Sequence, residues 1–190
     1  MKSDLDAIMQ SRNLDAFVVF GNAENNPPMY YLTGGGHVSH ATVIKKRGED
    51  AVYFYNYMER DEAAKSGLKL TPYSKYDYNE LLQKANGDLL LTSALRYQQM
   101  FEDVGVTKGR VGVYGHYDVG AVFGWLNHLQ KLMPAIEFVG EARDDSIFLR
   151  AMETKDENEV ARIRKMGKVT TAVVEKVKEY LTSCDVREDE

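Results

Sequence analysis

An apolar stripe runs along the last helix-forming segment of the chain and needs other protein to cover it. Its members follow alternating steps of three and four residues, namely Val160, Ile163, Gly167, Thr170, Val174, Val177 and Leu181. This spacing predicts one continuous helix face of about 25 residues, or about 37 Å. Thr154 and Glu157 stand three apart before it, so we expect them to form a capping box. The stripe could lie across the rest of the chain, cover a neighbouring chain or begin a second domain.

The chain before this helix alternates between strand and helix patterns. The predicted strands are residues 15–21, 40–46, 50–57, 68–73, 109–115 and 135–140. Such alternation predicts an α/β fold in which helices flank both faces of the sheet. The second and third strands are separated by a short turn and form an antiparallel hairpin, so the sheet should be mixed. We expect residues 22–36 to be irregular, because Pro27, Pro28 and three consecutive glycines interrupt them.

Composition excludes several classes of protein. The 190 residues carry a formal net charge of −5 and are 44% hydrophobic, which is typical of a globular protein. No Lys/Arg cluster is present, which argues against nucleic acid as a partner. Cys184 is the single cysteine, so no internal disulfide can form and a reducing cytoplasm is expected. The charged N-terminus does not resemble a signal peptide, and no segment has the length of apolar sequence that a membrane span needs.

Three segments, in this order and spacing, resemble the creatinase/Xaa-Pro aminopeptidase/prolidase family, the pita-bread metallopeptidases. They are "LDAIMQSRNLDAFVVFGNAENNPPMYYLTG", "AVYFYNYMERDEA" and "LRAMETKDENEVARIRKMGKVTTAVVEKVKEYL". The resemblance implies that residues 1–150 form the N-terminal domain of the family. Residues 151–190 would then be the linker and the first helix of a truncated catalytic domain, with the stripe as the interface for that domain.

The resemblance also implies a function. The parent would be a cytoplasmic hydrolase that forms a homodimer and cleaves short proline-containing peptides, as an Xaa-Pro dipeptidase (prolidase) or aminopeptidase P. In such enzymes two divalent metal ions (Mn, Co or Zn), held by two Asp, one His and two Glu, activate a water. The family places all five ligands downstream of the helix, so the 190-residue chain is expected to hold no metal and to be inactive. Its role would be to support dimerisation and to limit substrate access.

Two alternatives remain open at this stage. A metal-free relative would serve as a module that binds peptides or proteins, and a creatinase-type amidinohydrolase would have a similar N-terminal domain. The residues present do not separate creatinase from peptidase.

The candidates for substrate approach lie in and near "YYLTGGGHVSH". His37 and His40 stand three apart, but no carboxylate lies within the motif to complete a metal site. They are either ordinary loop histidines or, as the family implies, contacts for the end of a peptide at a partner's active site. Tyr31 and its neighbour Tyr30 are further candidates for substrate contact, although a tyrosine beside a strand end is usually a core residue.

Other residues have structural interpretations. Tyr53, Tyr55 and Tyr57 alternate on a strand and are expected beneath a helix rather than as a base-stacking platform. Trp125 and Phe123 are expected in the core or at a dimer contact. Asp144 and Asp145 are interpreted as helix caps rather than catalytic carboxylates. Asp118 is expected to cap the helix that follows it.

Overall fold

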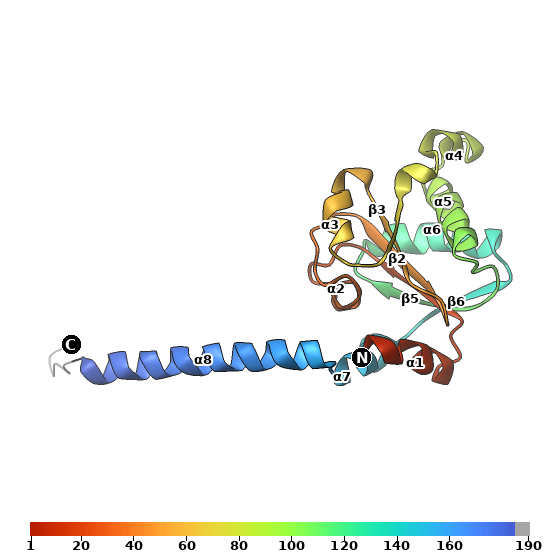
Figure 1. Ribbon diagram of the computed structural model, residues 1–190. Helices are drawn as coiled ribbons and strands as arrows, with labels where there is room; N and C mark the ends of the chain where they lie inside the picture. The colour runs from red at the N-terminus through yellow and green to blue at the C-terminus, as the bar shows by residue number, and fades with distance from the viewer. Residues whose placement is uncertain (185–190) are drawn as a thin grey trace. The chain divides into compact units, whose positions relative to one another are not determined.

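The computed structural model describes residues 1–184, which form two compact units (Figure 1). The larger unit, Lys2–Met152, carries a six-stranded sheet. Its strands are β1 (Ala16–Phe20), β2 (Ala41–Lys46), β3 (Val52–Tyr55), β4 (Lys69–Pro72), β5 (Gly109–Gly115) and β6 (Ile136–Gly140). Its longer helices are α1 (Leu5–Ser11), α2 (Pro27–Thr33), α3 (Arg60–Ala64), α4 (Tyr78–Lys84), α5 (Leu89–Asp103) and α6 (Val119–Leu132), and α7 (Ile147–Glu153) ends at the unit boundary.

The sheet is mixed, as the sequence predicts. The strand order is β4-β3-β2-β1-β5-β6. The hairpin β2–β3 is antiparallel, and β1 also pairs antiparallel with β2. β1 is parallel to β5, and β5 is parallel to β6. All five residues of β1 are buried, as expected of a central strand that is covered on both faces.

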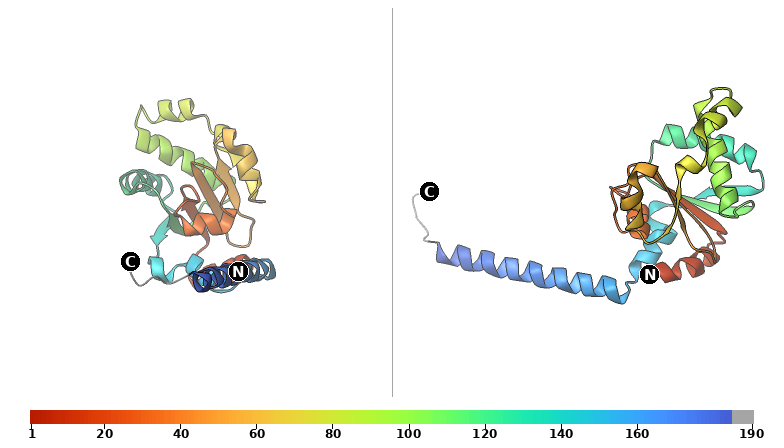
Figure 2. Two further views of the ribbon diagram at one scale, coloured as in Figure 1. Left: turned by 90° about the vertical axis from the view of Figure 1, so that its left-hand side faces the viewer. Right: turned by 45° about the horizontal axis from the view of Figure 1, so that its top comes forward.

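Helices cover both faces of the sheet and produce two apolar cores (Figures 1 and 2). Because side chains alternate along a strand, Phe17 and Val19 of β1 enter one core while Val18 and Phe20 enter the other. The first core includes residues of α1, α2 and α7. The second core includes residues of α5 and α6, among them Trp125, which stacks on the Tyr97 ring at 4.4 Å. The predicted α/β fold with two covered faces is confirmed.

The prediction of irregular structure for residues 22–36 is wrong in part, because α2 occupies Pro27–Thr33. Both prolines lie in the first turn of the helix, where backbone N–H groups have no intrahelical acceptor and a fixed φ favours the helix. Gly34 then ends α2 in the left-handed conformation at φ 80°, and its N–H donates to the Tyr30 carbonyl at 2.8 Å.

The smaller unit contains one long helix, α8 (Glu157–Ser183), shown in Figures 1 and 2. This helix includes every residue of the predicted apolar stripe. A single helix cannot cover its own apolar face, so no other described residue of this unit shelters the stripe. The second predicted segment, residues 151–190, includes residues 185–190, which lie outside the part of the chain that the structure describes. No helix within residues 1–184 combines the length and apolarity that crossing a bilayer demands.

The predicted capping box is displaced by two residues. Asp156 is the N-cap, and its Oδ1 accepts from the Glu159 N–H at 2.8 Å. Glu159 Oε2 in turn accepts from the Asp156 N–H at 2.9 Å. Thr154 Oγ1 instead accepts from the N-terminal ammonium of Met1 at 2.5 Å. Both Thr154–Glu157 and Asp156–Glu159 have the required spacing, and the second pair forms the box.

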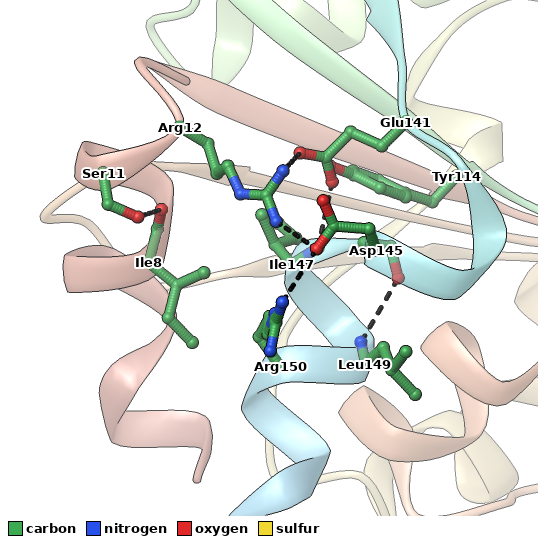
Figure 3. A network of polar contacts seen from close by, with 10 residues as sticks. Ile8, Ser11, Arg12, Tyr114, Glu141, Asp145, Ile147, Leu149 and Arg150 are labelled. Carbon is green, nitrogen blue, oxygen red and sulfur yellow. Dashed lines mark hydrogen bonds and ion pairs between the residues drawn. The ribbon is translucent and has the colours of Figure 1, made fainter.

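The interpretation of Asp145 as a helix cap is also corrected. Its Oδ1 accepts from Arg12 Nη2 at 2.6 Å and from Arg150 Nη2 at 3.2 Å (Figure 3). The hydroxyl that accepts from a first-turn amide of α7 is that of Ser146, which receives the Leu149 N–H at 3.2 Å. The predicted cap of α6 is confirmed, since Asp118 Oδ1 accepts from the Ala121 N–H at 2.7 Å.

Candidate functional site

The loop of residues 34–40, which holds both candidate histidines, is fixed at several points. Val38 is buried in the core beneath it. The Ser39 N–H and Ser39 hydroxyl both donate to Glu59 Oε1, at 2.9 and 2.7 Å. A Cβ added to Gly35 would lie 2.5 Å from the Tyr30 ring, so the loop also passes close to that side chain. The loop is therefore an ordered part of the domain surface.

Beside this loop lies a cleft of about 500 Å³, here called the loop cleft. Its walls are formed by Asn22, Ala23, Glu24, Tyr30, Gly35, Gly36, His37, Val38, Ser39 and Glu59. The walls carry the carboxylates of Glu24 and Glu59 and the imidazole of His37. A site with this charge balance is suited to the amino end or the N–H groups of a peptide.

The predicted site residues take different positions. His37 lines the loop cleft and is exposed. His40 is exposed but does not line the cleft. Tyr31 points into the core, is 8% exposed, and donates its hydroxyl to the Ala151 carbonyl at 3.1 Å. The adjacent Tyr30 is the tyrosine that lines the cleft, because successive residues of α2 face different sides of the helix.

Glu59 and Glu62 lie near His37. Glu59 is in the turn after β3, and Glu62 belongs to α3. Glu59 follows Asn56, whose side chain accepts from the Met58 N–H at 3.2 Å and begins a short 3₁₀ turn. Glu59 Oε2 is buried and has no hydrogen-bond partner among the described residues. The pKa of Glu62 is lowered chiefly by its hydrogen bond from Lys65, with a further contribution from the His37 backbone amide. Sequence reasoning missed Glu24 and Glu59, since neither lies in the motif that contains the histidines.

The described residues do not provide a catalytic metal centre. Within residues 1–184, no group of three or more His, Cys, Asp or Glu side chains is arranged to hold a metal ion. The ligand set of two Asp, one His and two Glu therefore does not fit the residues present, and no hydrolytic step can be assigned to them. The loop cleft instead offers carboxylate oxygens that accept hydrogen bonds and an imidazole that can donate or accept one.

The aromatic residues singled out in the sequence are divided between core and surface. Tyr53 and Tyr55 are buried in the first core, as expected, whereas Tyr57 lies outside the strand and is exposed. Trp125 is 4% exposed, but Phe123 on the same helix is 70% exposed. Phe123 is thus available for contact with another molecule.

A profile of the Creatinase/Prolidase N-terminal domain matches residues 2–143. The chain belongs to this family. The match covers nearly all of the unit that carries the sheet, and so confirms the resemblance seen in the sequence. No curated protein sequence matches the chain.

Two solved structures of larger proteins share the fold of this creatinase/prolidase N-terminal domain. A dipeptidase from Pyrococcus horikoshii OT3 matches 99% of the chain with a TM-score of 0.58 and 16% identity. An X-Pro aminopeptidase from Thermotoga maritima MSB8 matches 94% of it with a TM-score of 0.56 and 13% identity. The chain spans 45% of the length of the dipeptidase and 43% of that of the aminopeptidase.

Proposed function

We propose that this chain acts as the N-terminal, non-catalytic domain of a metal-dependent Xaa-Pro peptidase of the prolidase or aminopeptidase P type. The observation that carries the proposal is the family match over residues 2–143. The shared fold with a dipeptidase and an X-Pro aminopeptidase supports it. Hydrolysis, and the two metal ions that it requires, would belong to the part of such proteins that this chain does not span.

The domain's first role in this proposal is to limit substrate access. The loop cleft brings together His37 from the loop of residues 34–40, Glu24 from the segment between β1 and α2, and Glu59 from the turn after β3. Placed at the mouth of an active site, these groups would hold the end of a short peptide by hydrogen bonds. The bulk of the domain would exclude a folded chain from the same space.

The second role is to support a homodimer. Val119 and Phe123 lie one turn apart on α6 and are 80% and 70% exposed. Leu90 lies beside them, because a Cβ added to Gly124 would come within 2.7 Å of Leu90 Cδ1. Leu89 and Leu90 are themselves exposed. These four exposed side chains, Leu89, Leu90, Val119 and Phe123, are here called the α6 patch and are of the apolar kind found at protein interfaces.

The hydrolytic part of the proposal is tested with the purified 190-residue chain. Incubated with Ala-Pro or Gly-Pro and added Mn²⁺ or Co²⁺, it should release no free proline above a mock-purified control. Measurable turnover that follows the protein through purification would contradict the assignment of a non-catalytic role.

The access role is tested by NMR titration of the same chain with Ala-Pro. The ring protons of His37 should shift in a saturable manner, whereas those of His40 should not. His37→Ala should abolish the change in the neighbouring amides, and His40→Ala should preserve it. Equal responses of the two rings, or none, would overturn the role given to His37.

A further inference from the structure

A second cleft lies where the direction of chain progression across the sheet reverses. From β1 the chain moves outward through β2, β3 and β4, and α5 then returns it to β5 on the other side of β1. β1 and β5 are parallel, so their carboxyl ends lie at the same edge of the sheet. In open α/β sheets this reversal leaves a crevice in which small ligands commonly bind.

The structure has a cleft of about 650 Å³ at this edge, here called the switch-point cleft. Its lining includes Asn26, which follows β1, and Gly115 and His116 at the end of β5. Glu141 and Arg143 follow β6, and α7 contributes Phe148. The volume falls within the range of small-molecule sites in proteins. The loop cleft shares none of these residues, so the two clefts are separate sites.

The backbone at the base of this edge is closely packed. Gly115 has a φ of +120°, and a Cβ there would lie 2.2 Å from the Phe20 carbonyl oxygen. Gly21 has a φ of +95°, and a Cβ there would lie 2.2 Å from the His116 carbonyl oxygen. Both positions exclude side chains, so the ends of β1 and β5 stay in direct backbone contact and the cleft has a rigid base.

Glu141 in the cleft wall already has its partners. It accepts from the Tyr114 hydroxyl at 2.6 Å and from the Ile147 N–H at 2.9 Å, and Arg12 Nη1 lies 3.8 Å from its second oxygen (Figure 3). Burial and the neighbouring carboxylate raise the pKa of Tyr114, so the hydroxyl remains a donor. By contrast, Arg143 makes no ion pair with any residue in the described part of the chain.

The remaining lining combines opposite charges with an apolar wall. Arg143 and His116 offer donors for an anion, and Asp144 offers an acceptor for a cation. Leu149 and Met152 supply apolar surface from α7. This combination is complementary to a small zwitterion that has an apolar side chain.

Asn26 closes the base of the cleft next to the end of β1. It is 2% exposed and lines the cleft, and its Nδ2 donates to the Phe20 carbonyl at 2.7 Å. Its Oδ1 is buried and has no hydrogen-bond partner among the described residues. Neighbouring atoms cover this oxygen, so Asn26 belongs to the closed base of the cleft and is not a ligand contact.

We propose that the switch-point cleft binds a free α-amino acid with an apolar side chain. Its carboxylate contacts Arg143 and His116, its ammonium group contacts Asp144, and its side chain packs on Leu149 and Met152. The site is independent of the peptide-binding role given to the loop cleft, so either can fail without the other.

The test is a titration of the ¹⁵N-labelled 190-residue chain with L-leucine, followed by NMR. The amides of Gly115, His116 and Phe148 should shift in a saturable manner. Leucinamide, which lacks the carboxylate, should bind about tenfold or more weakly, as should leucine to the Arg143→Gln variant. Arg143 is exposed, so the substitution should leave the rest of the spectrum unchanged.

Arg60→Gln is the matched control, since Arg60 is an exposed arginine that lies outside the cleft. Its affinity for leucine should equal that of the parent chain. Absence of saturable shifts at the cleft amides would overturn the proposal. So would equal affinities for leucine and leucinamide, or an undiminished affinity in Arg143→Gln.

Discussion

The guanidinium of Arg12 lies 2.6 Å from Asp145 Oδ1 and joins the end of α1 to the turn before α7 (Figure 3). The two residues are 133 positions apart in the sequence. Arg150 also donates to the same oxygen, so one carboxylate connects both helices. The hydrogen bond from Arg12 is the main cause of the lowered pKa of Asp145, and Arg150 adds to the effect.

Asp145→Asn should lower the free energy of unfolding at neutral pH but not in strong acid. A carboxyl whose pKa is lower in the folded state stabilises that state above its unfolded pKa, near 3.9, and this stabilisation is lost as the pH falls through the folded value. Urea titrations of both proteins at pH 7 and at pH 2.5 measure the difference. Asp61→Asn, at an exposed aspartate, is the control. A constant difference at both pH values would contradict the prediction.

Gly115→Ala should destabilise the domain by more than about 2 kcal/mol, because a methyl group there meets the Phe20 carbonyl and the φ of +120° is strained for alanine. Gly34 is the matched control. It also has a positive φ, but no atom lies within 4 Å of an added Cβ, so Gly34→Ala should cost only about 1–2 kcal/mol. Chemical denaturation of the two variants gives the comparison. Equal losses would show that the close contact between β1 and β5 is unimportant.

Asp156→Ala should speed hydrogen exchange in the first turn of α8 and weaken the start of the helix by about 1 kcal/mol. The reason is that Asp156 Oδ1 accepts the Glu159 N–H. Thr154→Ala should leave that exchange unchanged, because Thr154 is outside the capping box. Hydrogen exchange, measured by mass spectrometry on a peptide that spans residues 157–162, distinguishes the two variants. A larger effect of Thr154→Ala would contradict the prediction and would support Thr154–Glu157 as the capping pair.

Phe123→Ser should shift the chain from dimer to monomer if the α6 patch forms the proposed interface. The side chain is 70% exposed, so its loss should leave the fold intact while removing the centre of an apolar contact. Light scattering coupled to size-exclusion chromatography measures the mass. Met58→Ser changes another exposed apolar residue, outside the patch, and should leave the mass unaltered. Identical masses for the parent and both variants would exclude the patch from self-association.

The fold was predictable where local patterns and tertiary packing agree. The strand at β1 and the hairpin β2–β3 follow from apolar runs and turn residues, and Asp118 marks the start of α6. α2 was missed because two prolines and a glycine run usually interrupt structure, yet here they begin and end a helix. The capping box was displaced because two residue pairs share the same spacing.

The candidate site was less predictable because it depends on long-range contacts. Glu59 reaches Ser39 across the β2–β3 hairpin, 20 positions away in the sequence. No local pattern reports that pairing. Which of Tyr30 and Tyr31 faces the cleft depends on the rotation of α2 about its axis, and the helix itself was not expected. The switch-point cleft likewise required the strand order, which periodicity alone does not give.

The position of β1 between β2 and β5 has a consequence for biosynthesis. The side-chain carboxylate of Asp15, next to β1, accepts a hydrogen bond from the N–H of Arg110, which the ribosome adds 95 residues later. Until β5 is synthesised, one edge of the wholly apolar strand β1 has no strand to pair with. Such an edge invites pairing with other chains, so we expect ribosome-stalled products that end before residue 109 to need chaperones to stay dispersed.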